Sequence, residues 1–192
     1  MKKLIFSNLA YYAFILLFMS IYCGGSYFVD FYWRPWAYSR DKNAKLFVGK
    51  WAGQFQDPDG VSKEMTLEIF TPFTTAERFG SALNCGGKTN GKSRKSFEGV
   101  ATVKSKLGEE NYEIWGYFND HNFHSFYFYE RVKQPLSVAN FYLKQTPPDC
   151  IWKGDELTIV LPFYYQKLDG AGFYSSEDPR FEYKATVAMK RQ

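Results

Sequence analysis

A long stretch without charge near the N-terminus limits what the rest of the chain can be. Residues 4–29 contain no charged side chain, and Lys2 and Lys3 precede them. Residues 4–22 supply about 20 mostly apolar side chains, the number that an α-helix needs to cross roughly 30 Å of hydrocarbon. We therefore expect residues 1–29 to form an uncleaved, single-pass transmembrane anchor.

Two other N-terminal segments are compatible with this stretch. A cleaved signal peptide would use Cys23-Gly24-Gly25 as a weak processing site, and a lipoprotein would be modified at Cys23. A signal peptide ordinarily has an apolar region of about 7–15 residues, which is shorter than the one here. The stretch is also followed by aromatic residues of the kind found at a membrane–water interface, namely Tyr27, Phe28, Phe31, Tyr32, Trp33 and Trp36.

The distribution of charge separates the anchor from the rest of the chain. Of 24 basic and 20 acidic residues, six basic and two acidic ones lie in residues 1–45, which leaves 18 of each in 46–192. A nucleic-acid-binding domain would carry a basic face, so this neutral domain is not expected to bind nucleic acid. The basic excess beside the apolar stretch suits anionic lipid head groups.

The cysteines and the short N-terminus favour a domain outside the cytoplasm, and no Asn-x-Ser/Thr sequon occurs. We expect a bacterial inner-membrane protein whose C-terminal domain faces the periplasm. A disulfide between Cys85 and Cys150 is then the natural hypothesis, and two unpaired cysteines are the alternative.

After a linker over residues 30–45, apolar residues alternate with polar ones at period two, which is typical of half-buried strands. Turn signals such as Asp57-Pro58-Asp59-Gly60 separate them. Pro162 favours an edge or a bulge in its strand. Residues 46–192 are therefore expected to form an all-β, antiparallel barrel or sandwich of eight or nine strands. The expected strands are 49–55, 64–69, 79–85, 97–103, 112–118, 123–132, 138–143, 157–166 and 181–189.

The two ends of this domain resemble the lipocalins and the broader calycin group. Gly49-x-Trp51 lies in the first expected strand, and Lys190-Arg191 follows the last one. The resemblance implies a closed, eight-stranded barrel in which Arg191 or Lys190 covers the indole of Trp51. It also implies a small apolar ligand in the barrel mouth. Gly49, Trp51 and Arg191 are structural positions in this pattern and do not contact the ligand.

Aromatic residues are densest over 112–129, and they occupy both faces of the two strands expected there. One face must be core, and the other must meet a second core layer, a ligand, a partner or the membrane. We place Trp115, Tyr117, Phe126 and Phe128 on one shared face and predict that they bind the ligand.

No catalytic motif is present, and His121 and His124 fall in an expected turn, so we predict a protein that is not an enzyme and has no cofactor or metal. The leading hypothesis is a membrane-anchored barrel that binds a small hydrophobic ligand or a lipid. A lumen filled with side chains would exclude this hypothesis. The alternative is a protein–protein interaction module, such as an inhibitor or assembly factor, in a cell-envelope complex.

Overall fold

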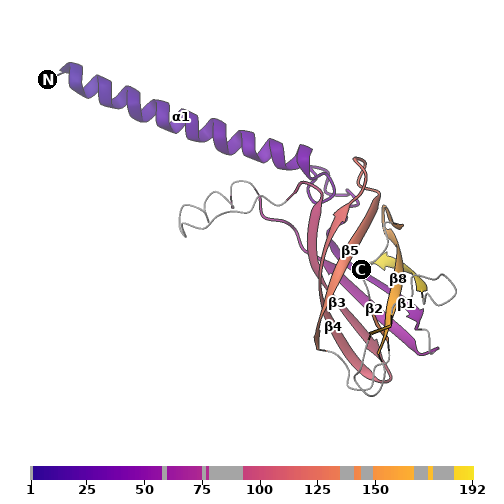
Figure 1. Ribbon diagram of the computed structural model, residues 1–192. Helices are drawn as coiled ribbons and strands as arrows, with labels where there is room; N and C mark the ends of the chain where they lie inside the picture. The colour runs from indigo at the N-terminus through magenta and orange to yellow at the C-terminus, as the bar shows by residue number, and fades with distance from the viewer. Residues whose placement is uncertain are drawn as a thin grey trace.

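A long helix and a β-barrel make up the computed structural model (Figure 1). It describes residues 2–57, 60–74, 77, 93–134, 141–143, 149–166, 173–174 and 184–192. The elements in chain order are α1 (Lys2–Trp33), β1 (Gly49–Gln56), β2 (Ser62–Ile69), β3 (Ser96–Ser105), β4 (Gly108–Phe118), β5 (Ser125–Gln134), β6 (Phe141–Leu143), β7 (Cys150–Lys153), β8 (Glu156–Gln166), β9 (Phe173–Tyr174) and β10 (Lys184–Arg191).

Helix α1 extends away from the barrel and continues past residue 29 to Trp33 (Figure 1). Every side chain over residues 11–21 is exposed, and most of them are large and apolar. In the part of the chain that the structure describes, no helix is both long enough and apolar enough to cross a membrane.

Eight of the described strands close into an antiparallel barrel. The order is β1-β2-β3-β4-β5-β7-β8-β10, and β10 pairs with β1 as well as with β8, which completes the ring. The short strands β6 and β9 pair with the last part of β8 outside this ring. The sequence left open a barrel or a sandwich, and the closed barrel is the fold that forms.

The period-two pattern decides which side chains enter the barrel. In β2, the buried residues are Lys63, Met65, Leu67 and Ile69, and they alternate with more exposed neighbours. The same alternation runs through β3 and β4. Because a closed sheet has no open edge, each inward side chain lies against the inward side chains of the other strands.

The residues between α1 and β1 are partly inside the barrel rather than a free linker. Trp36 and Phe47 have no exposed surface, and we call the end of the barrel that they fill the helix end. The ring centroid of Phe47 lies 4.9 Å from those of Phe97 and Phe118 and 5.1 Å from that of Phe126. This interlocked packing of rings holds the segment between α1 and β1 in the barrel.

The first and last strands meet at the helix end. The guanidinium carbon of Arg191 lies 4.4 Å from the ring centroid of Trp51, and its Nη1 donates to the carbonyl oxygen of Val48 at 3.0 Å. Gly49 has a φ of 121°, and a Cβ there would lie 3.0 Å from this Nη1. Glycine therefore supplies both the backbone conformation and the space for the guanidinium.

Two of the expected strands, and one that was not expected, need comment. Residues 79–85 lie outside the described residues. Pro162 lies inside a continuous β8, at the end of the stretch 156–162 that pairs with β10. Strand β7 also pairs within this stretch, at residues 156–158, and β6 pairs with residues 163–165 beyond it. The sequence missed β7, since its four residues are too few to show a period and lie just after Pro147 and Pro148.

Candidate functional site

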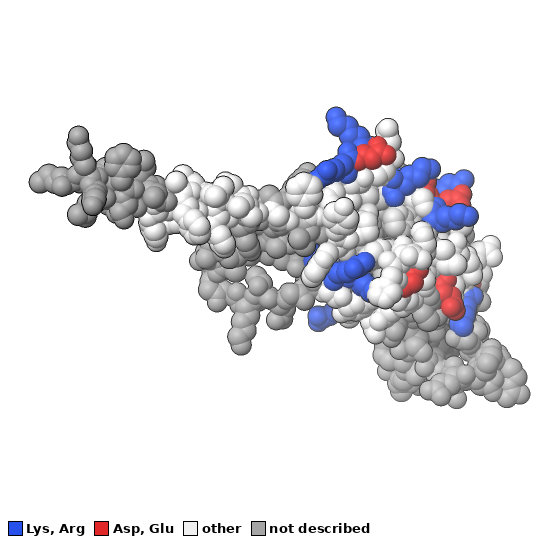
Figure 2. Space-filling view, turned by 90° about the horizontal axis from the view of Figure 1, so that it is seen from above, with Lys and Arg blue, Asp and Glu red and all other residues white. Residues whose placement is uncertain are grey.

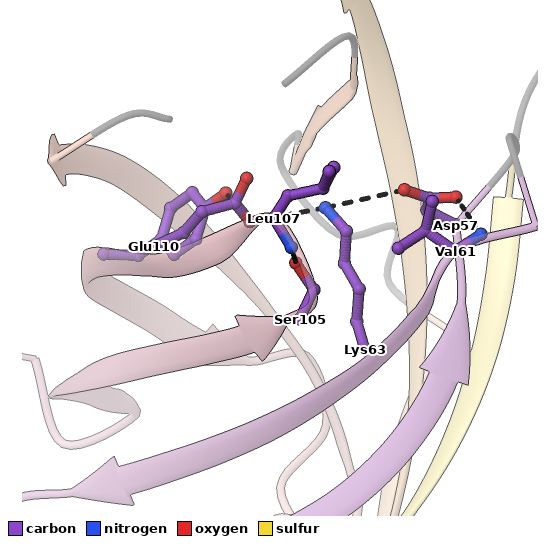
Figure 3. Close-up of polar contacts among 7 residues, drawn as sticks. Asp57, Val61, Lys63, Ser105, Leu107 and Glu110 are labelled. Atoms are coloured by element: carbon purple, nitrogen blue, oxygen red, sulfur yellow. Dashed lines mark hydrogen bonds and ion pairs between the residues drawn. The ribbon is translucent and has the colours of Figure 1, made fainter. Parts of the chain in front are cut away.

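Three charged side chains meet inside the barrel at the end opposite the helix end, which we call the far end. Lys63 Nζ lies 3.4 Å from Glu110 Oε2 and 3.7 Å from Asp57 Oδ2 (Figure 3). Asp57 follows β1, Lys63 is in β2, and Glu110 is near the start of β4. The three are brought together because the β1–β2 turn and the start of β4 both lie at this end of the barrel.

This far-end cluster is almost completely buried. Lys63 is 4% exposed, Glu110 2% and Asp57 8%. Tyr112, also buried, donates its hydroxyl to Glu110 Oε2 at 3.2 Å, and the backbone N–H of Val61 donates to Asp57 Oδ1 at 2.8 Å. Glu110 Oε1 is buried and accepts no hydrogen bond from the residues that the structure describes.

The cluster is surrounded by apolar side chains. Glu110 lies directly opposite Val103 on β3, and Val103 in turn lies opposite Met65 on β2. Phe55 and Phe163, with ring centroids 6.1 Å apart, add aromatic surface at the same end. A buried charge in such surroundings is costly unless it is paired and hydrogen-bonded, so the unpaired oxygen of Glu110 is the feature that needs an explanation.

The two ends of the lumen differ in how freely their side chains can rearrange. At the helix end, rigid rings interlock, and moving one displaces its neighbours. At the far end, Met65 is a long, unbranched side chain that can change rotamer without backbone movement. The far end can therefore rearrange at a lower energetic cost than the helix end.

The predicted ligand-binding residues do not share one face, which corrects the prediction. Trp115 pairs with Tyr129 and Tyr117 with Tyr127, and all four lie on the outside of the barrel. Phe126 and Phe128 point inward and have no exposed surface. Directly opposite residues of an antiparallel pair lie on the same face, and here odd-numbered residues of β4 face odd-numbered residues of β5.

The reason for this register is the turn between the two strands. Phe123 has a φ of 58°, unusual for a bulky residue, and its ring packs against Phe118 with centroids 5.4 Å apart. Phe123 is therefore part of the turn, and β5 begins only at Ser125. Because side chains alternate at period two, a change of one residue in register moves every side chain to the other face.

The four outward residues form an aromatic surface, which we call the outer aromatic patch. The rings of Trp115 and Tyr129 stack with centroids 5.8 Å apart, and those of Tyr117 and Tyr127 lie 5.9 Å apart. Trp115 and Tyr117 are 39% and 38% exposed. Partial burial in this patch is the main cause that raises the pKa of the Tyr127 hydroxyl, and the neighbouring Tyr129 raises it further.

One face of the described surface is of mixed charge. Figure 2 shows Lys and Arg side chains interspersed with Asp and Glu side chains over the face that it presents. One ion pair, Lys133 Nζ to Glu113 Oε1 at 2.7 Å, lies next to the outer aromatic patch. This arrangement agrees with the neutral charge balance of residues 46–192.

Cys150 is buried in the core at the start of β7. Cys85 lies outside the described residues, so the disulfide between them stays a prediction.

Sequence reasoning missed the far-end cluster, although a signal for it was present. Lys63 occupies the inward phase of a strand whose other inward residues are Met65, Leu67 and Ile69. Glu110 is likewise in phase with Tyr112 and Ile114 in β4. A charged residue in the apolar phase of a strand predicts a buried charge, and two such residues in one domain predict a pair.

Comparison with protein-family models gives no match, and neither does comparison with curated protein sequences. Among solved structures, the chain is similar to "Structure of EF1p2_mFAP2b bound to DFHBI", with a TM-score of 0.47 and 14% identity over 76% of this chain and 93% of that one. It is also similar to a barrel described as "De novo design of a fluorescence-activating beta barrel", with a TM-score of 0.43 and 12% identity over 79% of this chain and 99% of that one.

Proposed function

We propose that this protein is a membrane-tethered, non-catalytic barrel that holds a small, mostly apolar molecule in the far end of its lumen. The observation that carries the proposal is the far-end cluster, in which Glu110 keeps a buried oxygen without a partner among the described residues. Such an atom costs about 1–3 kcal/mol, and natural proteins tend to accept costs of this kind at functional sites. A ligand that hydrogen-bonds to Glu110 would remove the cost.

The site is limited to the far end. The interlocked rings around Phe47 fill the helix end of the lumen, so a ligand of the kind first expected does not fit there. At the far end, movement of Met65 would open space lined by Val103 and Phe163. The ligand would then replace the contacts that this side chain gives up.

The tether is supported by the exposed apolar surface of α1. Side chains over residues 11–21 are exposed on all sides of the helix, and a surface of this size in a soluble protein would normally be covered. Near the end of α1, the guanidinium carbon of Arg40 lies 4.5 Å from the ring centroid of Phe28, beside a pocket that these residues line with Phe31 and Tyr32. Aromatic and basic side chains of this kind suit a membrane–water interface.

We place the protein in a bacterial inner membrane with the barrel in the periplasm, as the charge distribution and the cysteines favour. The barrel should stay with membranes through an alkaline wash, and protease added outside spheroplasts should digest it. Release by the wash would contradict the tether, and protection from the protease would contradict the orientation.

The ligand is tested by native mass spectrometry of the full chain extracted in detergent. We expect a bound small molecule on the wild type and on Thr102→Phe, whose side chain points out of β3, and a loss of that mass in Val103→Phe, whose side chain points in. Near-ultraviolet circular dichroism checks that both variants fold. A wild type without a bound mass, or equal retention by both variants, would contradict the proposal.

The outer aromatic patch supports a second candidate function, binding of an envelope protein. Trp and Tyr are the residues most enriched among interface positions that dominate binding energy, and Trp115 and Tyr117 are both exposed. Crosslinking from a photoreactive residue at position 117 should then give one discrete adduct in membranes, whereas position 113, on the same strand and paired to Lys133, should give less. Equal or absent crosslinking at both positions would contradict this function.

A further inference from the structure

We infer that the molecule held at the far end carries a positively charged amino group. This inference rests on the proposed function and concerns the chemical class of the ligand. Among the described residues of the cluster, Asp57 and Glu110 are acidic and Lys63 is basic. The cluster therefore has a formal charge of −1 in a place where solvent does not reach.

The contacts of these side chains show which atom of the cluster is open to a donor. Glu110 Oε2 accepts hydrogen bonds from Lys63 Nζ at 3.4 Å and from the hydroxyl of Tyr112 at 3.2 Å. Asp57 forms an ion pair with Lys63 through Oδ2 and accepts a hydrogen bond from the N–H of Val61 on Oδ1. Of the carboxylate oxygens of Asp57 and Glu110, Glu110 Oε1 is buried without a donor among the described residues, so the open position of the cluster is at this atom.

A second acidic residue points toward the lumen from the neighbouring strand. Glu130 on β5 lies directly opposite Ile114 on β4, and Ile114 is buried in the core. Opposite residues share a face, so Glu130 is on the inward side. The inward-facing surface of β4 and β5 thus carries two carboxylates, Glu110 and Glu130.

Three classes of head group can be ranked against this site. A carboxylate would bring another negative charge to buried acids and has no proton to give to Glu110. A hydroxyl would donate a hydrogen bond to Glu110 Oε1 but would not neutralise the negative charge of the cluster. An ammonium group would do both, and hydrogen bonds between charged groups are stronger than neutral ones. The site therefore selects an amine with an apolar body, and it disfavours a fatty acid.

The test compares n-dodecylamine, n-dodecanol and dodecanoate, which share one chain and differ in the head group. Each is titrated against the full chain in lipid nanodiscs, with empty nanodiscs as the blank, and binding is measured by isothermal titration calorimetry. We expect the amine to bind roughly ten-fold or more tightly than the alcohol. The carboxylate should bind least.

Two matched variants assign the effect to one residue. Glu110→Gln keeps the shape of the side chain. It should weaken binding of the amine by roughly ten- to a hundred-fold and change binding of the alcohol little. Glu113→Gln, on the outward face of the same strand, should bind all three like the wild type. Should Glu110→Gln not fold, the ranking on the wild type still decides the question.

The outcomes separate this inference from the function on which it rests. Binding of dodecanoate as tight as that of the amine, or an unchanged amine affinity in a folded Glu110→Gln, overturns the ligand class and leaves the barrel as a binder of apolar molecules. No binding of any of the three overturns both.

Discussion

Replacing Lys63 with methionine tests whether the far-end cluster is a set of mutually compensating charges. Lys63 Nζ lies within 3.7 Å of a carboxylate oxygen of both Asp57 and Glu110, and all three residues are buried. Methionine fills a similar volume, so the main loss is the cation between two buried acids. Breaking a buried pair by removing one partner costs about 3–5 kcal/mol.

That cost is large enough to measure directly. For a domain of this size, we take a guanidinium dependence of about 4 kcal/mol per molar, so the unfolding midpoint of Lys63→Met should fall by about 1 M. The assay is equilibrium unfolding of the full chain in detergent, followed by the fluorescence of buried tryptophans such as Trp51. Lys104→Met, which removes an exposed partner of Glu109, should shift the unfolding free energy by about 0.5 kcal/mol or less.

A triple variant separates charge from packing. Lys63→Met combined with Asp57→Asn and Glu110→Gln removes all three charges, and it should regain most of the lost stability because no unpaired charge remains. A Lys63→Met protein within about 1 kcal/mol of the wild type would refute the reasoning. A triple variant as unstable as the single one would show that the loss comes from packing. Recovery would mean that stability alone does not require the charges, as expected of a binding site.

Three further changes have defined outcomes. A Cβ on Gly99 would lie 2.2 Å from a carbonyl oxygen of β2, so Gly99→Ala should destabilise the barrel by about 2 kcal/mol or more in the same unfolding assay. A hydrogen bond from Lys45 holds the pKa of Asp155 below its ordinary value, so the pair stabilises the fold above the pH at which Asp155 titrates and is lost as the pH falls through that lowered pKa. Lys45→Met should raise this pKa in a carboxyl carbon NMR titration. The Cys85–Cys150 bond predicts alkylation of both cysteines only after reduction, and a mass that is the same with and without reductant would contradict it.

The strands could be predicted from the sequence because their alternation is regular. In β2, the inward Met65 and Leu67 are followed by the polar Thr66 and Glu68, which are more exposed. The Gly49-x-Trp51 pattern likewise falls at the start of β1, where the positive φ of Gly49 and the nearby Arg191 give it a physical reason. These features depend on neighbours along the chain or on backbone conformation, which a single sequence records.

The faces of β5 could not be predicted in the same way. They depend on how many residues form the turn between Phe118 and the start of β5. Phe123 belongs to this turn because it takes a left-handed conformation and packs against Phe118. A bulky residue rarely does so, and nothing in its neighbours along the chain indicates it. The far-end cluster was missed for another reason. Charged residues in a strand are ordinarily taken to face solvent, whereas Lys63 and Glu110 are in the inward phase.

The closing seam of the barrel has a consequence for how the protein is made. Strand β10 completes the ring by pairing with both β1 and β8, and Arg191 bonds to Val48, which is 143 residues earlier in the chain. Synthesis at about 5–20 residues per second separates the two strands by roughly 7–30 seconds. During this interval, one edge of β1 has no partner, and an unpaired edge is a template for aggregation. Slower synthesis should therefore lower the yield of folded barrel even when the stability of the finished protein is unchanged.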